Sequence, residues 1–256
     1  MSARLFVPAT RVPPGTTKVT IEGDAHRYVG RVLRMRVGEG FVIFDGEGAE
    51  IDATLESITA TEAQISLGQR RKLDPPHARV TLLQGVPKGE RMDWVLQKTT
   101  ELGIACLVPV MTTRVVVKLD AEAAKAKQRR WQAIVQEAAR QCGRADVPQV
   151  QAPCSLAQAL ATLPAAERFV LWEEPGGQPF VQSLSGLARA RTAMDAQEPL
   201  HVQLLVGPEG GFAAEEVALA RAHDFVPVTL GPRVLRTETA AVVAVTLAQA
   251  AVGGFA

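Results

Sequence analysis

The chain has few of the features that mark disulfide-rich, metal-binding or membrane-spanning proteins. Its 256 residues contain only three cysteines, Cys106, Cys142 and Cys154, which are widely spaced and lack any close Cys or His pairing. This spacing argues against a disulfide framework and indicates no zinc site. The most apolar C-terminal run, residues 240–252, is too short to cross a bilayer, and the chain does not begin like a signal peptide. We therefore expect a cytoplasmic protein, with no membrane partner and no metal.

Two common phosphate-binding signatures are also missing. The chain has no Gly-x-x-x-x-Gly-Lys-Ser/Thr phosphate loop and no Gly-x-Gly-x-x-Gly dinucleotide motif. The glycine-rich stretch that it does have, residues 207–212, contains Glu209 and no lysine. An acid there would repel phosphate, but it could meet a cationic or hydroxyl-bearing ligand.

The formal net charge of +1 hides an uneven distribution of charge along the chain. Residues 79–144 hold twelve Lys or Arg against six Asp or Glu, whereas residues 145–256 hold six against eleven. Arginines also cluster at positions 27, 31, 34 and 36. Clustered basic residues suggest a polyanionic partner such as RNA, although a merely solvated basic face would give the same pattern.

The first 72 residues predict a small β-rich module. Apolar runs and alternation over residues 41–44, 51–55 and 63–67 are typical of strands, and Asp45-Gly46 indicates a hairpin between the first two. Before these strands, we expect Asp24 to cap a short helix whose Val29, Val32 and Leu33 face the sheet, leaving its arginines exposed.

A charged stretch ending in two prolines, residues 69–76, predicts a linker between two domains. We place the domains at residues 1–72 and 73–256. The second has alternating strand and helix patterns, which predict an α/β fold with a mostly parallel sheet covered by helices. The predicted strands cover residues 79–85, 106–110, 168–172, 202–206 and 226–230.

Two helices in the second domain carry basic residues. A helix over residues 88–103 has one apolar face and one basic face, and Trp94 on the basic face is either an RNA-stacking surface or part of the core. A second helix ends at Cys142, where Gly143 predicts a C-terminal cap. Arg144 follows as either an anion contact or a surface residue that complements the helix dipole.

The most informative feature is a pair of similar turns near the C-terminus. Two strand-like runs end in the stiff turns Gly207-Pro208-Glu209-Gly210-Gly211 and Gly231-Pro232-Arg233, about 25 residues apart, and each turn opens a helix. In open α/β sheets, ligands bind in the crevice beyond the carboxyl ends of the strands. Glycines there let backbone amides and carbonyls approach a planar heterocycle closely.

These motifs resemble those of a known family. The stretches 207–212 and 230–240, the segment 97–103, Arg130-Trp131 and 141–144 are similar to sequences of the RsmE family, whose members methylate N3 of a uridine in small-subunit ribosomal RNA. His26 and residues 31–34 resemble the family's RNA-binding segment, so the likeness covers most of the chain. One departure is Ala213, which stands where the family commonly has a Ser or Thr helix cap.

The resemblance implies an N-terminal PUA-like barrel, a C-terminal SPOUT methyltransferase domain with a trefoil knot, a homodimer and S-adenosylmethionine as the methyl donor. It implies 16S ribosomal RNA or the assembled small subunit as the partner. The residues that it assigns to the cofactor are Leu171, Trp172, Glu173, Val206, Gly207, Pro208, Glu209, Gly210, Gly211, Leu230, Gly231, Leu235, Thr237 and Ala240. Those that it assigns to RNA are Arg11, His26, Arg31, Arg34, Arg36, Lys88, Arg91, Lys98, Arg114 and Arg144.

The chemistry of uracil suggests two catalytic candidates. If the imide N3–H resembles a phenol with a pKa near 10, forming the anion at pH 7 costs about 4 kcal/mol, and one well-placed donor contributes about 3 to 4 kcal/mol. Arg236 is the candidate for stabilising the uracil oxygens, and Glu238 for orienting Arg236 or accepting the proton. Arg236 could instead contact an RNA phosphate, and Glu238 could be a first-turn acid that follows Thr237 as the helix N-cap.

Two other functions stay open on the residues alone. A ribose 2′-O-methyltransferase would share the superfamily, but the N-terminal module and the Arg-Thr-Glu-Thr-Ala run at 236–240 weigh against it. A non-catalytic RNA-binding or ribosome-assembly protein would use the basic stretches, and the loops would then be only turns.

Overall fold

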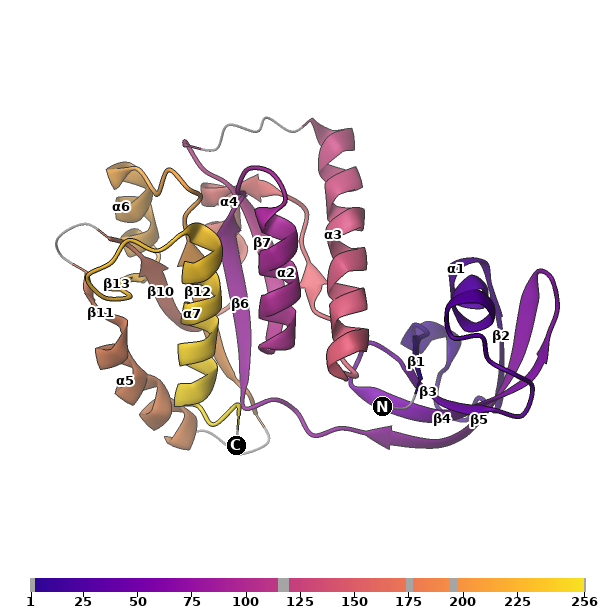
Figure 1. Cartoon of the computed structure of the whole chain (residues 1–256). Helices are drawn as coiled ribbons and strands as arrows, with labels where there is room; N and C mark the ends of the chain where they lie inside the picture. The colour runs from indigo at the N-terminus through magenta and orange to yellow at the C-terminus, as the bar shows by residue number, and fades with distance from the viewer. Residues whose placement is uncertain (1–2, 115–119, 174–176, 194–197, 256) are drawn as a thin grey trace. The chain divides into compact units, whose positions relative to one another are not determined.

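The chain forms two compact units. The computed structural model describes residues 3–114, 120–173, 177–193 and 198–255 (Figure 1). One unit consists of Met1–Asp74 with Ala139–Val147, and the other of Pro75–Ala138 with Pro148–Ala256. The first is β-rich and the second alternates strands and helices, as the sequence patterns predicted. The inclusion of residues 139–147 in the first unit was not predicted.

The smaller unit is built on a five-stranded mixed sheet in the order β1-β3-β4-β5-β2. β1 pairs with β3 in parallel and the other pairs are antiparallel. The strands are β1 (Arg4–Phe6), β2 (Lys18–Glu22), β3 (Gly40–Phe44), β4 (Ala49–Ile58) and β5 (Glu62–Lys72). Short helical turns η1 (Ala9–Arg11), α1 (Gly23–Arg27) and η2 (Tyr28–Val32) connect them.

Three local expectations for this unit were wrong. Val32 is 65% exposed, although Val29 is buried as expected, because η2 is a turn of π-helix that changes the spacing between successive side chains. Asp24 lies inside the first turn of α1, where it pairs with Arg27, and Glu22 holds the N-cap position. Residues 69–72, predicted as linker, continue β5.

The segment 139–147 packs into the smaller unit through specific contacts. Gly46 and Glu47 form isolated bridges with Asp146, and the guanidinium of Arg4 donates to the carbonyl of Arg144 at 2.9 Å. The guanidinium of Arg140 lies 4.0 Å from the centre of the Tyr28 ring, a cation–π arrangement. These contacts explain why the end of a helix that begins in the other unit belongs to this one.

The larger unit holds an eight-stranded sheet in which every pair is parallel, in the order β11-β13-β10-β12-β6-β7-β8, with β9 paired to β7. Its strands are β6 (Ala78–Gly85), β7 (Ile104–Met111), β8 (Gln149–Val150), β9 (Cys154–Ser155), β10 (Glu167–Leu171), β11 (Gln178–Pro179), β12 (Leu200–Val206) and β13 (Val226–Thr229). Its helices are α2 (Arg91–Glu101), α3 (Ala121–Cys142, of which the last residues belong to the smaller unit), α4 (Leu156–Thr162), α5 (Phe180–Ala193), α6 (Ala214–Ala222) and α7 (Thr237–Ala251).

Central strands of this sheet are mostly apolar and buried toward their C-terminal ends, as expected for parallel strands covered on both faces. β12 is buried from Val202 to Val206, and β6 is buried over its last four residues. Figure 1 shows α7 and α2 beside each other, in front of β12 and β6. The buried sheet therefore fixes the positions at which the loops after its strands begin.

The structure tests several of the expectations for the larger unit and its helices. Trp94 is 42% exposed on α2, so its assignment to the core was wrong and the stacking surface stays a prediction. Gly143 has a φ of +84°, as a C-terminal cap after α3 requires. Within the described ranges, no helix is long and apolar enough to span a bilayer, and no cluster of three His, Cys, Asp or Glu could hold a metal ion.

Candidate active site

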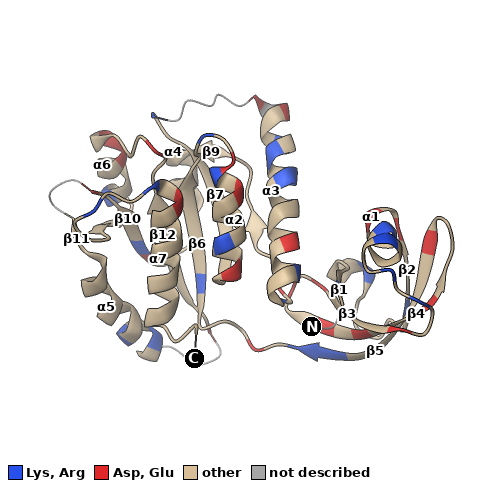
Figure 2. Cartoon of the chain, viewed as in Figure 1, with Lys and Arg blue, Asp and Glu red and all other residues tan. Residues whose placement is uncertain are grey.

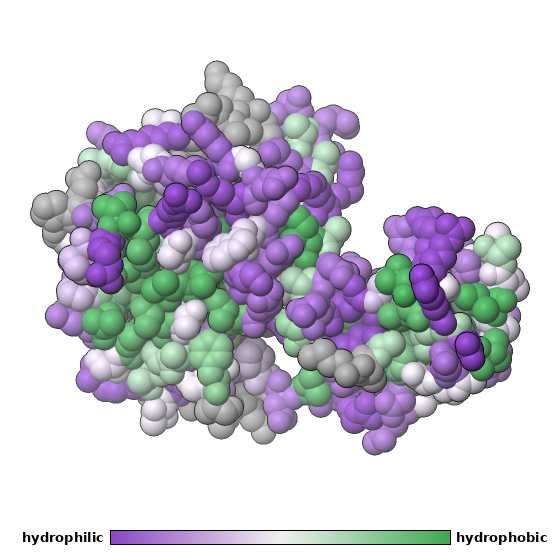
Figure 3. Space-filling view, viewed as in Figure 1, coloured by the Kyte–Doolittle hydropathy of each residue, from purple (hydrophilic) through white to green (hydrophobic). Residues whose placement is uncertain are grey.

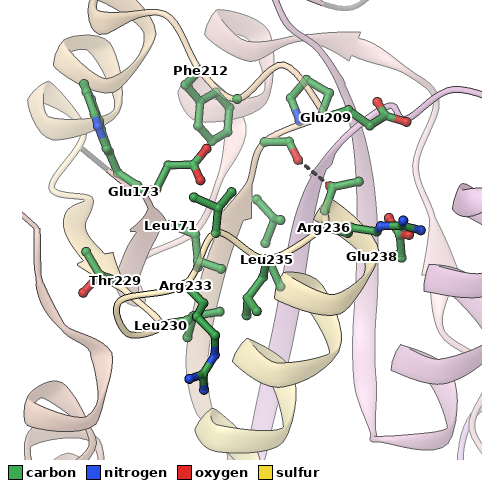
Figure 4. Close-up of a pocket in the computed structure, with 18 of the residues that line it drawn as sticks. Leu171, Glu173, Glu209, Phe212, Thr229, Leu230, Arg233, Leu235, Arg236 and Glu238 are labelled. Atoms are coloured by element: carbon green, nitrogen blue, oxygen red, sulfur yellow. Dashed lines mark hydrogen bonds between the residues drawn. The ribbon is translucent and has the colours of Figure 1, made fainter.

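One cavity of about 460 Å³ lies at the carboxyl ends of β10, β12 and β13 and at the start of α7 (Figure 4). Thirteen of the fourteen predicted cofactor residues line it, as do both catalytic candidates. The exception is Gly210, whose carbonyl accepts a hydrogen bond at 2.7 Å from the cavity-lining Arg114. The structure thus brings together segments that are separated by up to about 150 residues in the sequence, from Arg91 to Ala240.

The first loop, residues 207–213, is held close to the end of β6. A Cβ added to Gly85 would lie 2.5 Å from Cδ and 2.6 Å from the backbone nitrogen of Pro208, so only glycine lets the strand end and the loop approach. Gly211 has a φ of +65° and its N–H donates to the Pro208 carbonyl, which closes a tight turn. The loop therefore has a fixed path over the sheet.

Ala213 stands at the N-cap of α6, as expected, and has no side chain that can accept a hydrogen bond. Glu216 compensates from inside the helix: its Oε2 accepts from the N–H of Ala213 and its Oε1 from the N–H of Thr113. These bonds replace part of the missing cap, and they tie the end of the first loop to the loop after β7.

A buried polar network joins the first loop to α7. The Thr237 hydroxyl donates to the Gly207 carbonyl and accepts from Nε2 of the fully buried Gln84 at 2.9 Å. Arg236, not Thr237, occupies the N-cap position of α7, so the predicted cap was off by one residue. The Thr237 hydroxyl thus links the second loop to the first. Gln84 was not predicted as part of the site, because nothing in the sequence at the end of β6 indicates its hydrogen-bond partner.

This network predicts the effect of removing a single hydroxyl. We expect Thr237→Val to lower the free energy of unfolding by about 1 to 3 kcal/mol, because it removes two buried hydrogen bonds and leaves the Gly207 carbonyl with only the long 3.5 Å contact from Gln84. Chemical denaturation would measure the loss, and Thr237→Ser, which keeps the hydroxyl, is the matched control. Equal losses for both variants would contradict this role of the hydroxyl.

Three carboxylates and four arginines line the cavity. Glu209 is the most constrained carboxylate: its Oε1 accepts from the N–H of Lys88 at 2.9 Å and from the Arg91 guanidinium. Partial burial raises the pKa of the Glu209 carboxyl, but hydrogen bonds from its own N–H, from Lys88 and from Arg91, together with the charge of Arg91, outweigh burial and lower that pKa overall. Glu209 is therefore a carboxylate held ionised.

The lowered pKa of Glu209 makes a prediction about acid stability. Because the folded state favours the ionised carboxylate, its contribution is complete above the ordinary value near 4.5 and is lost as the pH falls through the lower folded pKa. The difference in unfolding free energy between the wild type and Glu209→Gln should therefore shrink below about pH 4.5. A difference that stays constant from pH 7 to pH 3 would exclude this contribution.

Glu238 differs from Glu209 in having a free oxygen. Its Oε1 lies 3.8 Å from Nε of Arg91, whereas its Oε2 is buried and has no hydrogen-bond partner in the part of the chain that the structure describes. A buried acceptor without a donor is costly and indicates a missing partner. Figure 4 shows Glu238 and Arg236 at the start of α7.

The predicted RNA residues of the smaller unit fall into two groups. Arg31, Arg34 and Arg36 are exposed, and their side chains have no hydrogen bond or ion pair among the described residues. Figure 2 shows basic positions, in blue, on the ribbon at α1. Arg34 adopts a φ of +53°, which is uncommon for a residue with a side chain. His26 and Arg11 instead bond to the carbonyls of Thr59 and Thr20.

The other predicted RNA residues are engaged within the protein. Arg144 pairs with Asp146 and is largely buried, and Lys98 pairs with Glu101 on α2. The Arg91 guanidinium donates to Glu209, and that of Arg114 donates to the Gly210 carbonyl. Lys88 contacts Glu209 through its backbone N–H. RNA contacts by these side chains stay predictions, and an ion pair must break or be shared for several of them to be made.

Five residues that line the cavity were not predicted: Phe212, Val228, Thr229, Arg233 and Val234. Val234 is 77% exposed, which is unusual for an apolar side chain beside a cavity. Arg233 and Val234 lie within the motif at 230–240. A prediction that took every residue of this loop as part of the site would have contained them. Val228 and Thr229 precede the loop and carry no signal of their own in the sequence.

Comparisons with known proteins bear on both units. A family model described as an RNA methyltransferase domain matches residues 74–249, and one described as an RNA methyltransferase PUA domain matches residues 21–68. The chain is similar to ribosomal RNA small subunit methyltransferase E of Bacillus subtilis, with 34% identity over 86% of this chain and 85% of that protein.

Two solved structures resemble the whole chain. A Legionella pneumophila protein in complex with the bound cofactor SAM is 33% identical, with a TM-score of 0.85 and 98% of each chain covered. A ribosomal RNA small subunit methyltransferase E from Neisseria gonorrhoeae bound to S-adenosyl methionine is 29% identical, with a TM-score of 0.81 and again 98% of each chain covered.

Proposed function

Because this chain belongs to the ribosomal RNA small subunit methyltransferase E family, the RsmE family, we propose that it transfers a methyl group from S-adenosylmethionine to N3 of a uridine in small-subunit ribosomal RNA. The family assignment confirms the predicted class of enzyme, its cofactor and its fold class, with a PUA-like unit ahead of the methyltransferase unit. The observation that carries the proposed reaction is that Arg236 and Glu238 line the same cavity as the loops at residues 207–211 and 230–235.

The residues present fit S-adenosylmethionine. The cavity volume lies within the range of about 300 to 1000 Å³ typical of small-molecule sites. Leu171, Phe212 and Leu235 offer apolar surface for a planar adenine, and the turn at Gly207–Gly211 offers backbone groups for hydrogen bonds. Glu173, Glu209 and Glu238 place three carboxylates among the four arginines of the cavity, and a carboxylate beside the sulfonium would offset its positive charge.

The bound cofactor supplies an electrophilic methyl group on a sulfonium. The protein must then make the uracil N3 nucleophilic and aim it at that methyl group. In the proposed mechanism, Arg236 donates to the uracil oxygens beside N3 and so stabilises the negative charge that develops there. Glu238 accepts the N3 proton on Oε2, the oxygen that lacks a partner within the described residues. Neither role needs a covalent intermediate.

Among the cavity carboxylates, Glu238 is better suited than Glu209 to accept a proton. Glu209 receives hydrogen bonds from Lys88, its own N–H and Arg91, and its pKa is lowered, so it is a weak base. Glu238 has one oxygen at a loose ion-pair distance and the other without a donor among the described residues. In this proposal Glu209 supplies a fixed negative charge to the site, and Glu238 accepts the proton.

The remaining details are also proposed. The smaller unit binds RNA through Arg31, Arg34 and Arg36, with residues 1–72 as RNA-binding domain and 73–256 as catalytic domain. The protein is expected to be a cytoplasmic homodimer with a trefoil knot in its catalytic domain. Figure 3 shows hydrophobic side chains gathered over the face of the larger unit where α7 lies, and the exposed Val181 and Val234 add to the apolar surface available for a partner subunit.

Isothermal titration calorimetry with S-adenosylmethionine tests this proposal against the non-catalytic alternative. We expect one saturable site, and we expect Gly211→Val, which places a branched side chain at a φ of +65° in the loop, to weaken it. Absence of binding by a protein with a cooperative unfolding transition would favour the RNA-assembly alternative. The site of methylation, N3 or ribose 2′-O, is then decided by analysis of the modified nucleoside.

A further inference from the structure

Arg91 has contacts that the basic charge pattern did not suggest. It begins α2, at the edge of the cavity, and its guanidinium reaches two acids from different elements. Nη1 donates to Oε1 of Glu209 in the loop after β12, and Nε lies 3.8 Å from Oε1 of Glu238 in the first turn of α7. The guanidinium thus occupies the space between the two acids.

The contacts on the Glu238 side are asymmetric. Arg91 engages Oε1 alone, while Oε2 is buried and has no donor in the described part of the chain. The Glu238 side chain is 15% exposed, so water satisfies this oxygen poorly. The charge of Arg91 beside one oxygen favours a single orientation of the carboxylate, and it leaves the other oxygen as an acceptor without a donor among the described residues.

Glu209 explains why Arg91 holds this position. Its Oε1 accepts from the backbone N–H of Lys88 at 2.9 Å, so the acid that binds Arg91 is itself tied to the segment just before α2. The lowered pKa of Glu209 keeps it ionised and able to hold the guanidinium. The first cofactor loop is thereby linked to Glu238 through one side chain.

We propose that Arg91 is a positioning residue, which Glu209 holds in place and which orients the Glu238 carboxylate so that Oε2 receives the uracil N3 proton. This inference rests on the proposed function, because it assumes that Glu238 is the acceptor. In the step itself the N3–H bond breaks and its proton forms an O–H bond on Oε2. The electron pair of N3 forms the N–CH3 bond, and the pair of the broken S–CH3 bond returns to sulfur, leaving a neutral thioether.

The other charged groups around Glu238 do not make this contact. Arg236, Arg233 and Arg114 line the same cavity, as does Glu173, but none of them has a hydrogen bond or ion pair with Glu238 among the described residues. β6 and β12 end in the uncharged Gln84–Gly85 and Val206, and the arginines of α5, Arg189 and Arg191, lie near its last turn, at the far end from the start of α7 (Figures 1 and 2). Among the residues that the structure describes, Arg91 is therefore the cation placed to orient this acid.

The activity experiment compares Arg91→Gln with Arg91→Lys. We expect Arg91→Gln to lower kcat about tenfold or more, with less than about a threefold change in the KM for RNA and in the Kd for S-adenosylmethionine by calorimetry. Arg91→Lys should recover part of kcat, since it keeps the charge without the planar fork. In a Glu238→Gln background, Arg91→Gln should cause no further loss, because the oriented acid is already absent.

A phosphate contact would give a different pattern. Arg91→Gln would then raise the KM for RNA with kcat unchanged and reduce the salt dependence of RNA binding, which would overturn the inference. Equal loss of kcat in Arg91→Lys and Arg91→Gln, together with a large loss of thermal stability, would also overturn it in favour of a structural role.

A measurement without activity separates this inference from the proposed function. If Glu209 holds Arg91 in place, the losses in melting temperature caused by Arg91→Gln and Glu209→Gln are smaller together than their sum. Additive losses would refute this coupling whether or not the chain methylates RNA. Non-additive losses in a protein whose wild type forms no N3-methyluridine would leave the coupling standing and refute the proposed reaction.

Discussion

Replacing Arg236 by alanine should abolish most methyl transfer while sparing cofactor binding. Arg236 is exposed at the N-cap of α7, lines the cavity and makes no side-chain cap to the helix, so the fold does not require its guanidinium. Loss of one donor to a developing oxyanion costs about 100- to 1000-fold in kcat. Single-turnover assays with RNA measure the rate, and calorimetry measures the affinity for S-adenosylmethionine.

Arg221→Ala is the matched control, since Arg221 is an exposed arginine in the last turn of α6 and does not line the cavity. We expect this variant to keep the wild-type rate. Unchanged kcat in Arg236→Ala would remove its catalytic role. A rise in the KM for RNA alone would instead identify Arg236 as a phosphate contact, the alternative that the sequence left open.

Replacing Gly85 by alanine, which adds one methyl group, should markedly weaken cofactor binding. Its new Cβ would lie within 2.6 Å of two atoms of Pro208 and 3.0 Å from the carbonyl carbon of Gly207. These atoms belong to the loop backbone and a ring, which cannot rotate away, so the loop must shift. We expect Gly85→Ala to weaken binding of S-adenosylmethionine at least about tenfold and to destabilise the fold by about 1 to 3 kcal/mol.

Gly186→Ala tests whether the effect is specific to the loop contact. Gly186 lies inside α5, and a Cβ there would meet nothing within 4 Å. Because alanine is the better helix former, this variant should stabilise the protein by about 0.5 to 1 kcal/mol and leave the affinity for the cofactor unchanged. Normal cofactor affinity in Gly85→Ala would mean that the first loop does not need its close contact with β6.

The sequence predicted the elements of the larger unit well because its signals there are strong and local. The predicted strand at residues 202–206 lies within β12, and all of the turn at 207–211 except Gly210 lines the cavity, as the glycines indicated. Strand ends and glycine-rich turns leave clear patterns because a buried parallel strand must be apolar and a tight turn must contain residues that tolerate unusual φ.

Long-range partners could not be predicted in the same way. Nothing local distinguishes Gln84 from any polar residue near a strand end, because its partners Thr237 and Gly207 are more than 120 residues away. The basic segments and the family resemblance suggested RNA for Arg91 and Arg144, but Arg91 pairs with the distant Glu209 and Arg144 with Asp146, two residues along the chain. A basic residue in a basic segment has the same pattern whether it contacts RNA or an acid of its own chain.

The π-helical turn shows a different limit. Val29 and Val32 were placed on one face by ordinary helical spacing, but the wider turn of η2 leaves Val32 exposed. The same segment ends with Arg34 at a positive φ, so its backbone departs from a regular helix where the predicted RNA contacts begin. Periodicity predicts regular elements, and it fails where the backbone is irregular.

The chemical identity of the nucleoside that this protein modifies is the most direct test of the proposed reaction. Small-subunit ribosomal RNA and assembled small subunits lacking the modification would be incubated with the protein and S-adenosylmethionine, then digested and analysed by mass spectrometry. We predict N3-methyluridine at one position with the wild type and nearly none with Arg236→Ala. A 2′-O-methylated nucleoside, or no methylation of either substrate by a protein that binds the cofactor, would contradict the proposed reaction.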